Sequence, residues 1–406
     1  MKIDVDLGAV NLADPSLYEV GDPDAVWATL RRRAPVFRNG EAFGHPFWAV
    51  TRYEDAVSVY GNWSVFTSER GMMLGRDPAE GDPGAGRMLV VTDPPRHAKL
   101  RRIVGRPFTP RMMRQLEDSI RSSVVRHLGH ALARETCDFV SDVAARIPVS
   151  VICELLGVPR DDWEWMHHLT SVAIGSGDPE ADRHVTPADR AQAYTDILLY
   201  YSDLVAHRRR DPGDDVVSTL VHGAVDGCPL SDEDILLNCT NLIIGGNETT
   251  RHAASGGVLA FADRPGEWRR VRDEPERVPT AVEELLRWTT PVMHLMRVAV
   301  ADTEIGGQRV RAGDAVVIWN ASANRDENVF DDPQRFDTAR HPNRHLAFGI
   351  GEHYCVGAAL ARLELRVLLE EMRRRVASIE RAGPVERVPS IVLRGIKRLP
   401  VRLVHA

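Results

Sequence analysis

Apolar residues recur at intervals of three and four positions over most of the chain from residue 96 onward, which predicts a protein built mainly from helices. One long helix is expected from Ser231, whose side chain can cap the helix end together with Asp234. A shorter helix is expected to open with a capping pair of Thr280 and Glu283, and the last strong helix follows Cys355. The apolar faces of the first and last of these helices are formed by Ile235, Leu236, Cys239, Leu242 and Ile243, and by Val356, Leu360, Leu363 and Val367.

Alternating apolar and polar residues predict short strands near both ends of the chain. Residues 46–50 read as a strand that runs into a helix, and residues 297–319 read as a hairpin that turns at Gly306 and Gly307. Residues 71–88 contain five Gly and two Pro, which predicts a long loop, and its Met and Leu residues indicate that the loop covers something apolar. We find no repeat and no flexible linker. The expected fold is therefore a single domain over 1–406, mainly α with small β-sheets from about 20–55 and 290–320.

Composition narrows the class of protein. Of 406 residues, 43% are hydrophobic and 27% are charged, which excludes wholesale disorder. The net charge of −7 gives no reason to expect nucleic acid or an anionic membrane as the main partner. No apolar run approaches the ~20 residues of a membrane span, and the N-terminus lacks the apolar stretch of a secretory signal. Five cysteines without a C-x-x-C pair argue against a disulfide framework, so a cytoplasmic protein without a membrane anchor is expected.

The strongest chemical signal is the segment from Phe348 to Gly357, in which Cys355 lies in a glycine-rich turn before a helix. A helix N-terminus stabilises a thiolate, and the glycines allow a flat group to approach the backbone. A single thiolate suits a metal whose other ligands are not protein side chains, as in haem. Two alternatives remain open at this point: a small core cysteine, and a zinc ion shared with His353.

This segment resembles the haem-binding loop of the cytochromes P450, Phe-x-x-Gly-x-His/Arg-x-Cys-x-Gly. The resemblance extends to a Glu-x-x-Arg helix and to a later arginine that completes a structural triad. It implies the cytochrome P450 fold, with ferric haem b held by Cys355 as the iron ligand and O2 as co-substrate. The fixed loop positions are matched by Phe348, Gly351, His353, Cys355 and Gly357, and the triad by Glu284, Arg287 and Arg340.

A second segment, residues 243–250, is similar to the family's oxygen-activation helix. Gly245 and Gly246 each cost about 1 kcal/mol in a helix interior, which suggests that the helix passes close to a cofactor or opens a groove. The resemblance implies that Glu248 and Thr249 form a carboxylate–hydroxyl relay for protons. The alternative is a glycine-packed helix crossing, with the threonine bonded to the preceding turn.

The resemblance also implies the rest of the site. The carboxylate side chains of the haem are expected to be bound by His97, Arg101, Arg297 and His353. Further contacts with the haem are expected at Phe348, Gly349, Gly357 and Gly246. His294 is expected either to hydrogen-bond an oxygenated substrate or to be a partly exposed loop residue. The expected substrate pocket comprises Met73, Leu74, Met88, Leu89, Ile174, Leu242, Ile243, Val292, His294, Ile391 and Val392.

The function implied is a monooxygenase that hydroxylates or epoxidises a small organic molecule, in natural-product biosynthesis or in terpenoid or steroid oxidation. No flavin or nicotinamide motif is visible, so electrons are expected from a separate ferredoxin and ferredoxin reductase. The protein is expected to be a monomer. Oxidative coupling, isomerisation, peroxide-driven chemistry and a non-catalytic haem-thiolate binding protein are the alternatives. The expected docking face comprises Lys99, Arg102, Arg106, Arg111, Arg114, Arg362 and Arg366.

Overall fold

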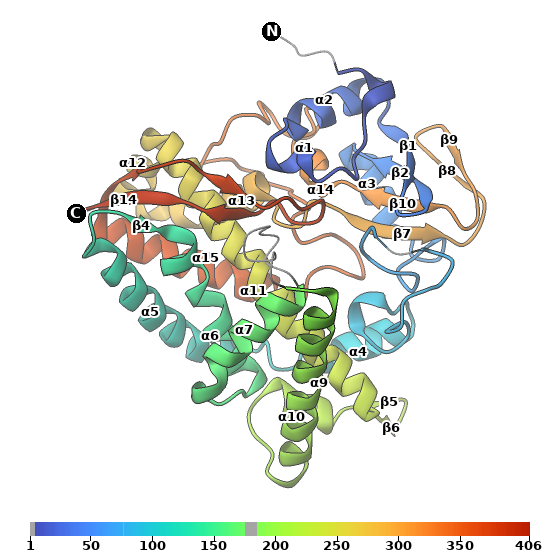
Figure 1. Cartoon of the computed structure of the whole chain (residues 1–406), viewed down its shortest axis with the longest axis horizontal. Helices are drawn as coiled ribbons and strands as arrows, with labels where there is room; N and C mark the ends of the chain where they lie inside the picture. The colour runs from blue at the N-terminus through green and yellow to red at the C-terminus, as the bar shows by residue number, and fades with distance from the viewer. Residues whose placement is uncertain (1–4, 76, 175–184) are drawn as a thin grey trace.

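The structure, a computed structural model, describes residues 5–75, 77–174 and 185–406, with a helical part and a smaller part built around a sheet (Figure 1). The helices are α1 (Ser16–Glu19), α2 (Pro23–Arg33), α3 (Tyr53–Gly61), α4 (Arg96–Val104), α5 (Pro110–Leu132), α6 (Arg146–Leu156), α7 (Trp163–Ile174), α9 (Pro187–Arg210), α10 (Val216–Val221), α11 (Asp232–Asp263), α12 (Pro265–Asp273), α13 (Val278–Thr289), α14 (Asn320–Ala323) and α15 (Ala358–Arg375).

The strands gather mostly near the two ends of the chain. They are β1 (Val36–Ala42), β2 (His45–Val50), β3 (Phe66–Thr67), β4 (Cys137–Asp138), β5 (Ala224–Val225), β6 (Cys228–Pro229), β7 (Leu295–Ala299), β8 (Thr303–Ile305), β9 (Gln308–Val310), β10 (Ala315–Ile318), β11 (Val376–Arg381), β12 (Glu386–Arg387), β13 (Ile396–Arg398) and β14 (Pro400–His405). The mainly helical prediction is confirmed, and so is the two-residue turn between β8 and β9 at Gly306 and Gly307. Strands β11 to β14 extend the β structure beyond the predicted 290–320.

The largest sheet joins strands from residues 36–67 to strands from residues 295–318, in the order β1-β2-β10-β7-β3. Strand β2 pairs parallel with β10, and the other neighbours are antiparallel. Helix α11 crosses the middle of the molecule (Figure 1) and packs against α6, α9 and α13. The predicted capping box of this helix is confirmed: the Ser231 side chain accepts from the Asp234 N–H at 3.1 Å, and Asp234 accepts from the Ser231 N–H at 3.2 Å.

The predicted capping box of α13 is wrong. The helix begins at Val278, two residues before Thr280. The Thr280 hydroxyl donates to the Thr338 carbonyl oxygen at 2.7 Å, and Glu283 instead pairs with Arg362 at 2.7 Å. Both side chains that the local pattern predicts as helix caps therefore form contacts with distant residues instead.

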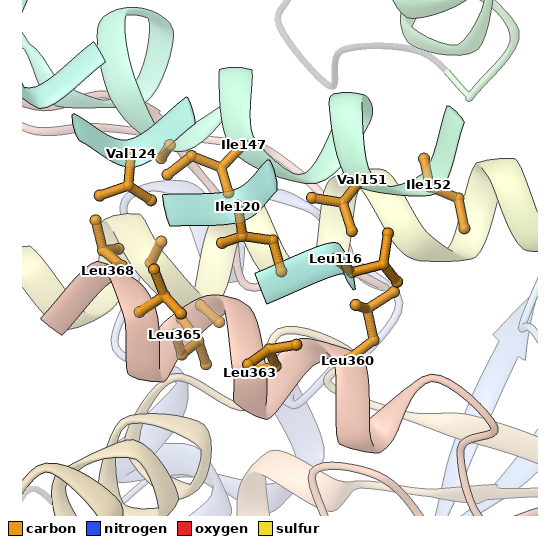
Figure 2. Close-up of a cluster of buried hydrophobic side chains, with 14 of the residues drawn as sticks. Leu116, Ile120, Val124, Ile147, Val151, Ile152, Leu360, Leu363, Leu365 and Leu368 are labelled. Carbon is orange, nitrogen blue, oxygen red and sulfur yellow. The ribbon is translucent and has the colours of Figure 1, made fainter. Parts of the chain in front are cut away.

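The main core lies between α5, α6, α11 and α15. Figure 2 shows branched aliphatic side chains from α5, α6 and α15 that point toward one another. Close packing of such side chains fixes the start of α15, the helix that follows Cys355. The labelled residues are Leu116, Ile120, Val124, Ile147, Val151, Ile152, Leu360, Leu363, Leu365 and Leu368, all buried. Among the described residues, no helix combines the length and the apolar character that crossing a membrane requires.

A buried ion pair connects α13 to the loop before the cysteine segment. The Glu284 carboxylate accepts two bonds of 2.8 Å from Arg287, and both side chains are fully buried. Arg340 adds a third contact to Glu284 at 3.2 Å, and the Asp337 N–H donates to Glu284 at 2.9 Å. Arg287 also donates to the Asn324 carbonyl oxygen at 2.9 Å. Glu284 is therefore shared by two arginines, and these contacts hold the loop from 324 to 340 against α13.

We predict that Glu284→Ala lowers the free energy of unfolding by about 3–5 kcal/mol, because it leaves Arg287 as a buried charge without its partner. Urea unfolding followed by circular dichroism measures the change. The matched control is Glu380→Ala: Glu380 pairs with Arg402 at 3.2 Å and both side chains are about half exposed. That variant is expected to lose less than about 1 kcal/mol. Equal losses in the two variants would contradict the prediction, and Glu284→Gln, which keeps the shape, gives a second measurement if Glu284→Ala does not fold.

Candidate active site

The cysteine loop is shaped by two glycines in the left-handed region, Gly349 (φ 67°) and Gly351 (φ 76°). The Cys355 N–H donates to the Phe348 carbonyl oxygen at 2.9 Å and closes the loop. A side chain at Gly351 would also lie 3.2 Å from the Tyr60 carbonyl oxygen, so both the angle and the space require glycine. The loop thereby presents Cys355 immediately before α15 begins.

The Cys355 side chain is accessible and yet desolvated. More than a third of its surface is exposed, although burial among neighbouring atoms raises the pKa of its thiol. A hydrogen bond from the Gly357 N–H and the positive charges of Arg101 and Arg362 act in the opposite direction and favour the thiolate. The sulfur is therefore accessible although many protein atoms lie around it. The other cysteines differ: Cys137, Cys153 and Cys239 are buried in the core, and Cys228 lies on the β5–β6 hairpin.

His97 on α4 is buried, and neither of its ring nitrogens has a hydrogen-bond partner among the described residues. Its ring lies 4.2 Å from that of His353, centroid to centroid. Burial, with the charges of His353 and Arg101, lowers the pKa of His97 to about 4. Buried polar groups in proteins are almost always hydrogen-bonded, so a neutral imidazole with a free N–H is a donor that lacks its acceptor.

Arg297 on β7 is a second buried donor. Only 4% of this residue is exposed, and no carboxylate in the described part of the chain lies within 4 Å of its guanidinium. It donates to the Met296 carbonyl oxygen at 2.7 Å, and its guanidinium lies 5.6 Å from the centre of the Tyr60 ring. Burial of an unpaired cation is costly, and it lowers the pKa of Arg297. Arg101 on α4 likewise has no ion pair among the described residues.

His353 is held in place by residues that the sequence did not single out. Its Nε2 lies 3.2 Å from the Ser68 hydroxyl and 3.7 Å from the Asp93 carboxylate. Burial opposes ionisation of Asp93, but hydrogen bonds from His353, Ser68 and Thr67 outweigh it and lower the pKa of Asp93 to about 2. Asp93 is therefore a carboxylate that fixes His353 beside His97.

This set of donors fits a porphyrin with carboxylate side chains. His97, Arg101 and Arg297 offer a neutral donor and two cations without carboxylate partners, and charge-assisted bonds to carboxylates would satisfy them. The accessible sulfur of Cys355 supplies one axial ligand. Among the described residues, no three His, Cys, Asp or Glu side chains gather as a metal site, so they offer no protein-ligated zinc at His353 and Cys355.

Helix α11 presents an accessible ridge to open space. Asn241, Gly245 and Thr249 are spaced four residues apart, so they lie on one face, and all three are accessible. A side chain added at Gly245 would meet no atom within 4 Å. The Thr249 hydroxyl donates to the Gly245 carbonyl oxygen at 3.0 Å. The open space beside Gly245 agrees with the groove expected from the sequence, whereas Asn241 was missed there, although its spacing of eight residues from Thr249 places it on the same face.

Gly246, expected to face the cofactor, serves helix packing. A side chain there would lie 3.0 Å from Ile152 on α6, so the glycine allows α11 and α6 to approach. Ile243 is fully buried and Leu242 nearly so, both in the main core. The two glycines therefore have different functions: Gly245 leaves open space beside α11, and Gly246 allows close packing of α11 against α6.

Glu248 turns away from the ridge. Its carboxylate forms an ion pair with Arg251 on the next turn, and His252 Nε2 lies 3.6 Å away. Burial raises the pKa of Glu248, and the charge and hydrogen bond of Arg251 oppose that rise. Adjacent helix residues do not face each other, so Glu248 and Thr249 are not in direct contact in this arrangement. Arg251 and His252 were not identified from the sequence, although i,i+3 and i,i+4 spacing places them beside the acid.

The expected pocket residues fall into two groups. Met73, Met88, Val292 and Val392 are half-buried, whereas Leu74, Leu89, Ile391 and His294 are buried. Leu74 and Ile391 pack in a cluster with Trp27 and Trp319, and Leu89 joins the main core. Ile174 ends α7, and its side chain lies outside the described part of the structure. Both ring nitrogens of His294 are bonded to backbone atoms, so the expectation of a free hydrogen bond to substrate, or of a partly exposed residue, is not met.

Comparisons with known proteins agree with this geometry. Residues 201–376 match the family model for Cytochrome P450. Cytochrome P450 NovI of Streptomyces niveus is 38% identical over 399 residues, which cover 98% of this chain and 97% of the relative. Linalool 8-monooxygenase of Pseudomonas putida is 35% identical over 403 residues, covering 97% and 98%. The crystal structure of P450 OxyD, which is involved in the biosynthesis of vancomycin-type antibiotics, aligns with a TM-score of 0.90 at 40% identity, over 98% of this chain and 100% of that one.

The similarity extends over nearly the whole chain, and the fold is that of solved cytochrome P450 structures. The family implies a haem-thiolate cofactor and O2 as co-substrate, which agrees with the accessible thiol and the unpaired donors around it. This chain therefore belongs to the cytochrome P450 family of haem-thiolate monooxygenases.

Proposed function

We propose that this cytochrome P450 inserts one oxygen atom of O2 into a small, largely apolar natural product, by hydroxylation or epoxidation. The observation that carries the proposal is the ridge of α11, where open space beside Gly245 is bordered by the Thr249 hydroxyl. Among its relatives, one is named for linalool and another is involved in the biosynthesis of an antibiotic. These names support a natural product over a central metabolite as the substrate.

The walls of the site suggest the shape of this substrate. We infer that the accessible face of Cys355 and the ridge of α11 border one cavity. The half-buried Met73, Met88 and Val292 would give it apolar walls, and methionine adapts readily to irregular ligands. The Asn241 amide lies on the same ridge and has no hydrogen-bond partner among the described residues. A substrate with an apolar body and one polar group fits these walls.

The residues divide the work between holding the cofactor and moving protons. Cys355 would hold the haem iron, and His97, Arg101, Arg297 and His353 would bind its carboxylates. Bound haem supplies the oxidising chemistry, helped by electron donation from its thiolate ligand. The Thr249 hydroxyl would hold a proton on the accessible ridge. Glu248, a buried acid with a raised pKa, would supply protons to it after its side chain leaves Arg251.

Electrons would come from a separate acidic protein, a ferredoxin served by its reductase. Of the expected docking residues, Lys99, Arg362 and Arg366 are already neutralised by ion pairs with Asp226, Glu283 and Glu117. The exposed cations that have no acidic partner among the described residues are Arg102, Arg106, Arg111 and Arg114. They lie on α4, on the first two turns of α5 and between these helices, so we propose this narrower face as the docking surface.

We predict that Cys355→Ala loses the thiolate-type carbon monoxide spectrum of the reduced protein, because it removes the axial sulfur ligand. Haem content and the carbon monoxide difference spectrum measure the effect. The control is Cys228→Ala, which removes an exposed cysteine on the β5–β6 hairpin and should leave both unchanged. A thiolate-type spectrum retained by Cys355→Ala would overturn the proposed function as a whole.

We predict that Thr249→Ala keeps its haem and its electron consumption but lowers the ratio of product formed to electrons consumed, with release of hydrogen peroxide or water. Proton-transfer groups contribute about 10²–10⁴-fold in rate, so a loss of at least about tenfold in this ratio is expected. The matched control is Thr250→Ala, because Thr250 lies about 100° further round the helix and is buried near Ala254 and Glu364. An unchanged ratio in Thr249→Ala would show that protons reach the site by another route.

We predict that charge reversal of Arg102 and Arg106 to Glu raises the KM for an acidic ferredoxin and weakens its dependence on salt, since steering between opposite charges is screened by ions. Substrate-saturated turnover at several ionic strengths measures both effects. The control is Arg269→Glu, an exposed arginine of α12, a helix that lies far from α4 in Figure 1. Equal KM values in the double variant and the wild type would exclude α4 as the docking surface.

A further inference from the structure

His294 lies between two segments that wall the expected pocket, and it is fully buried. The Leu74 N–H donates to its Nε2 at 3.3 Å, and its Nδ1 donates to the Ile391 carbonyl oxygen at 3.1 Å. Leu74 belongs to the loop 71–75, and Ile391 to the segment that precedes β13. A single imidazole ring therefore bridges two parts of the chain that are more than three hundred positions apart.

The chemistry of the bridge selects one form of the ring. Nε2 accepts a hydrogen bond, so it must be unprotonated, and Nδ1 must carry the proton. Burial, opposed by the Ile391 bond, lowers the pKa of His294 to about 4, so the ring is neutral near pH 7. The Trp319 ring lies 4.8 Å away, centroid to centroid, and helps to restrict the imidazole. No other neutral side chain of this size offers a donor and an acceptor on opposite edges of a rigid ring.

Backbone bonds reinforce the same junction on both sides. The Met296 N–H donates to the Met72 carbonyl oxygen at 2.7 Å, and the Met293 N–H donates to the Val392 carbonyl oxygen at 2.8 Å. Val292 also forms an isolated bridge with Leu393. His294 lies between these contacts along the chain. Its side chain links the loop 71–75 to the segment 390–394 at the point where the backbone of 292–296 passes between them.

We propose that His294 is a positioning residue that holds the loop 71–75 and the segment 390–394 at a fixed separation, and so sets how tightly the pocket grips its substrate. The inference rests on the proposed function, because it takes these two segments as pocket walls. Both nitrogens are used within the protein, so His294 itself makes no hydrogen bond to the substrate. Met73 and Val392, which are half-buried neighbours of the bonded residues, would make the contacts instead.

Three variants separate the two bonds of the ring. An asparagine amide reaches the position of Nδ1, so His294→Asn keeps a donor to Ile391 and loses the acceptor for Leu74. A glutamine amide reaches the position of Nε2, so His294→Gln keeps the acceptor and loses the donor. His294→Leu loses both bonds and keeps the apolar volume. Melting temperature and haem content identify any variant that is merely misfolded.

Hydrogen exchange read by mass spectrometry tests the positions of the two walls without any turnover. We expect peptides containing Leu74 to exchange about tenfold faster in His294→Asn and His294→Leu, because the Leu74 N–H loses its acceptor. In His294→Gln these peptides should keep their protection, while peptides covering 390–394 exchange faster. Equal exchange at Leu74 in the wild type and His294→Leu would overturn the proposal.

Ligand affinity tests the consequence for the pocket, with 4-phenylimidazole as a probe that fills the space between the walls and imidazole as a small control. We expect the dissociation constant of 4-phenylimidazole to rise about tenfold in His294→Leu and by less in His294→Asn and His294→Gln, each of which keeps one of the two bonds, while that of imidazole stays constant. An unchanged affinity for 4-phenylimidazole would overturn the positioning role. A wild-type protein that oxidises no organic compound would instead refute the proposed function, and both measurements on His294 would still stand.

Discussion

The buried pair of Glu284 and Arg287 is the contact from which the rest of the site is positioned. Arg287 donates to the Asn324 carbonyl oxygen, and the Asn324 side chain accepts the Leu346 N–H at 2.6 Å. Leu346 in turn accepts the Gly349 N–H at 3.0 Å, at the first turn of the cysteine loop. A series of hydrogen bonds thus leads from α13 to Gly349, at the start of the cysteine loop. Because each polar group in it is buried and satisfied, none can move without leaving another unpaired.

Helix α11 shows how one helix can serve two surfaces. One face carries Asn241, Gly245 and Thr249 toward open space, and the neighbouring face carries Ile243 and Gly246 into the core. A rotation of about 100° separates consecutive residues, so functional and structural positions alternate along the helix. Glu248 and Thr249 consequently point in different directions. A proton route between them requires either a turn of the Glu248 side chain or a bridging water molecule.

The family and the order of its motifs could be predicted from the sequence, because a glycine-rich turn with one cysteine and a glycine pair inside a helix are local patterns. Contacts between distant segments could not be predicted. The two bonds of His294, for example, join residues 220 and 97 positions away. The i,i+3 spacing of Glu248 and Arg251 permits an ion pair, but it does not show that the pair is buried. For Thr280 the local pattern itself was misleading. It predicts a helix cap, but the Thr280 hydroxyl donates to the carbonyl oxygen of a residue 58 positions away. Which of two adjacent glycines faces open space depends on Ile152 of another helix.

The donors of His97 and Arg297 also make cofactor uptake part of folding. A chain that has just been synthesised must bury both groups before any carboxylate is available to them, at a cost of about 1–3 kcal/mol for each unsatisfied group. Cofactor binding removes this cost, so it shifts the folding equilibrium toward the native state by mass action. The amount of functional protein in a cell would therefore follow its haem supply as well as its rate of synthesis. Growth on limiting iron would leave a pool of chains that open locally around α4 and β7 and are removed by proteases.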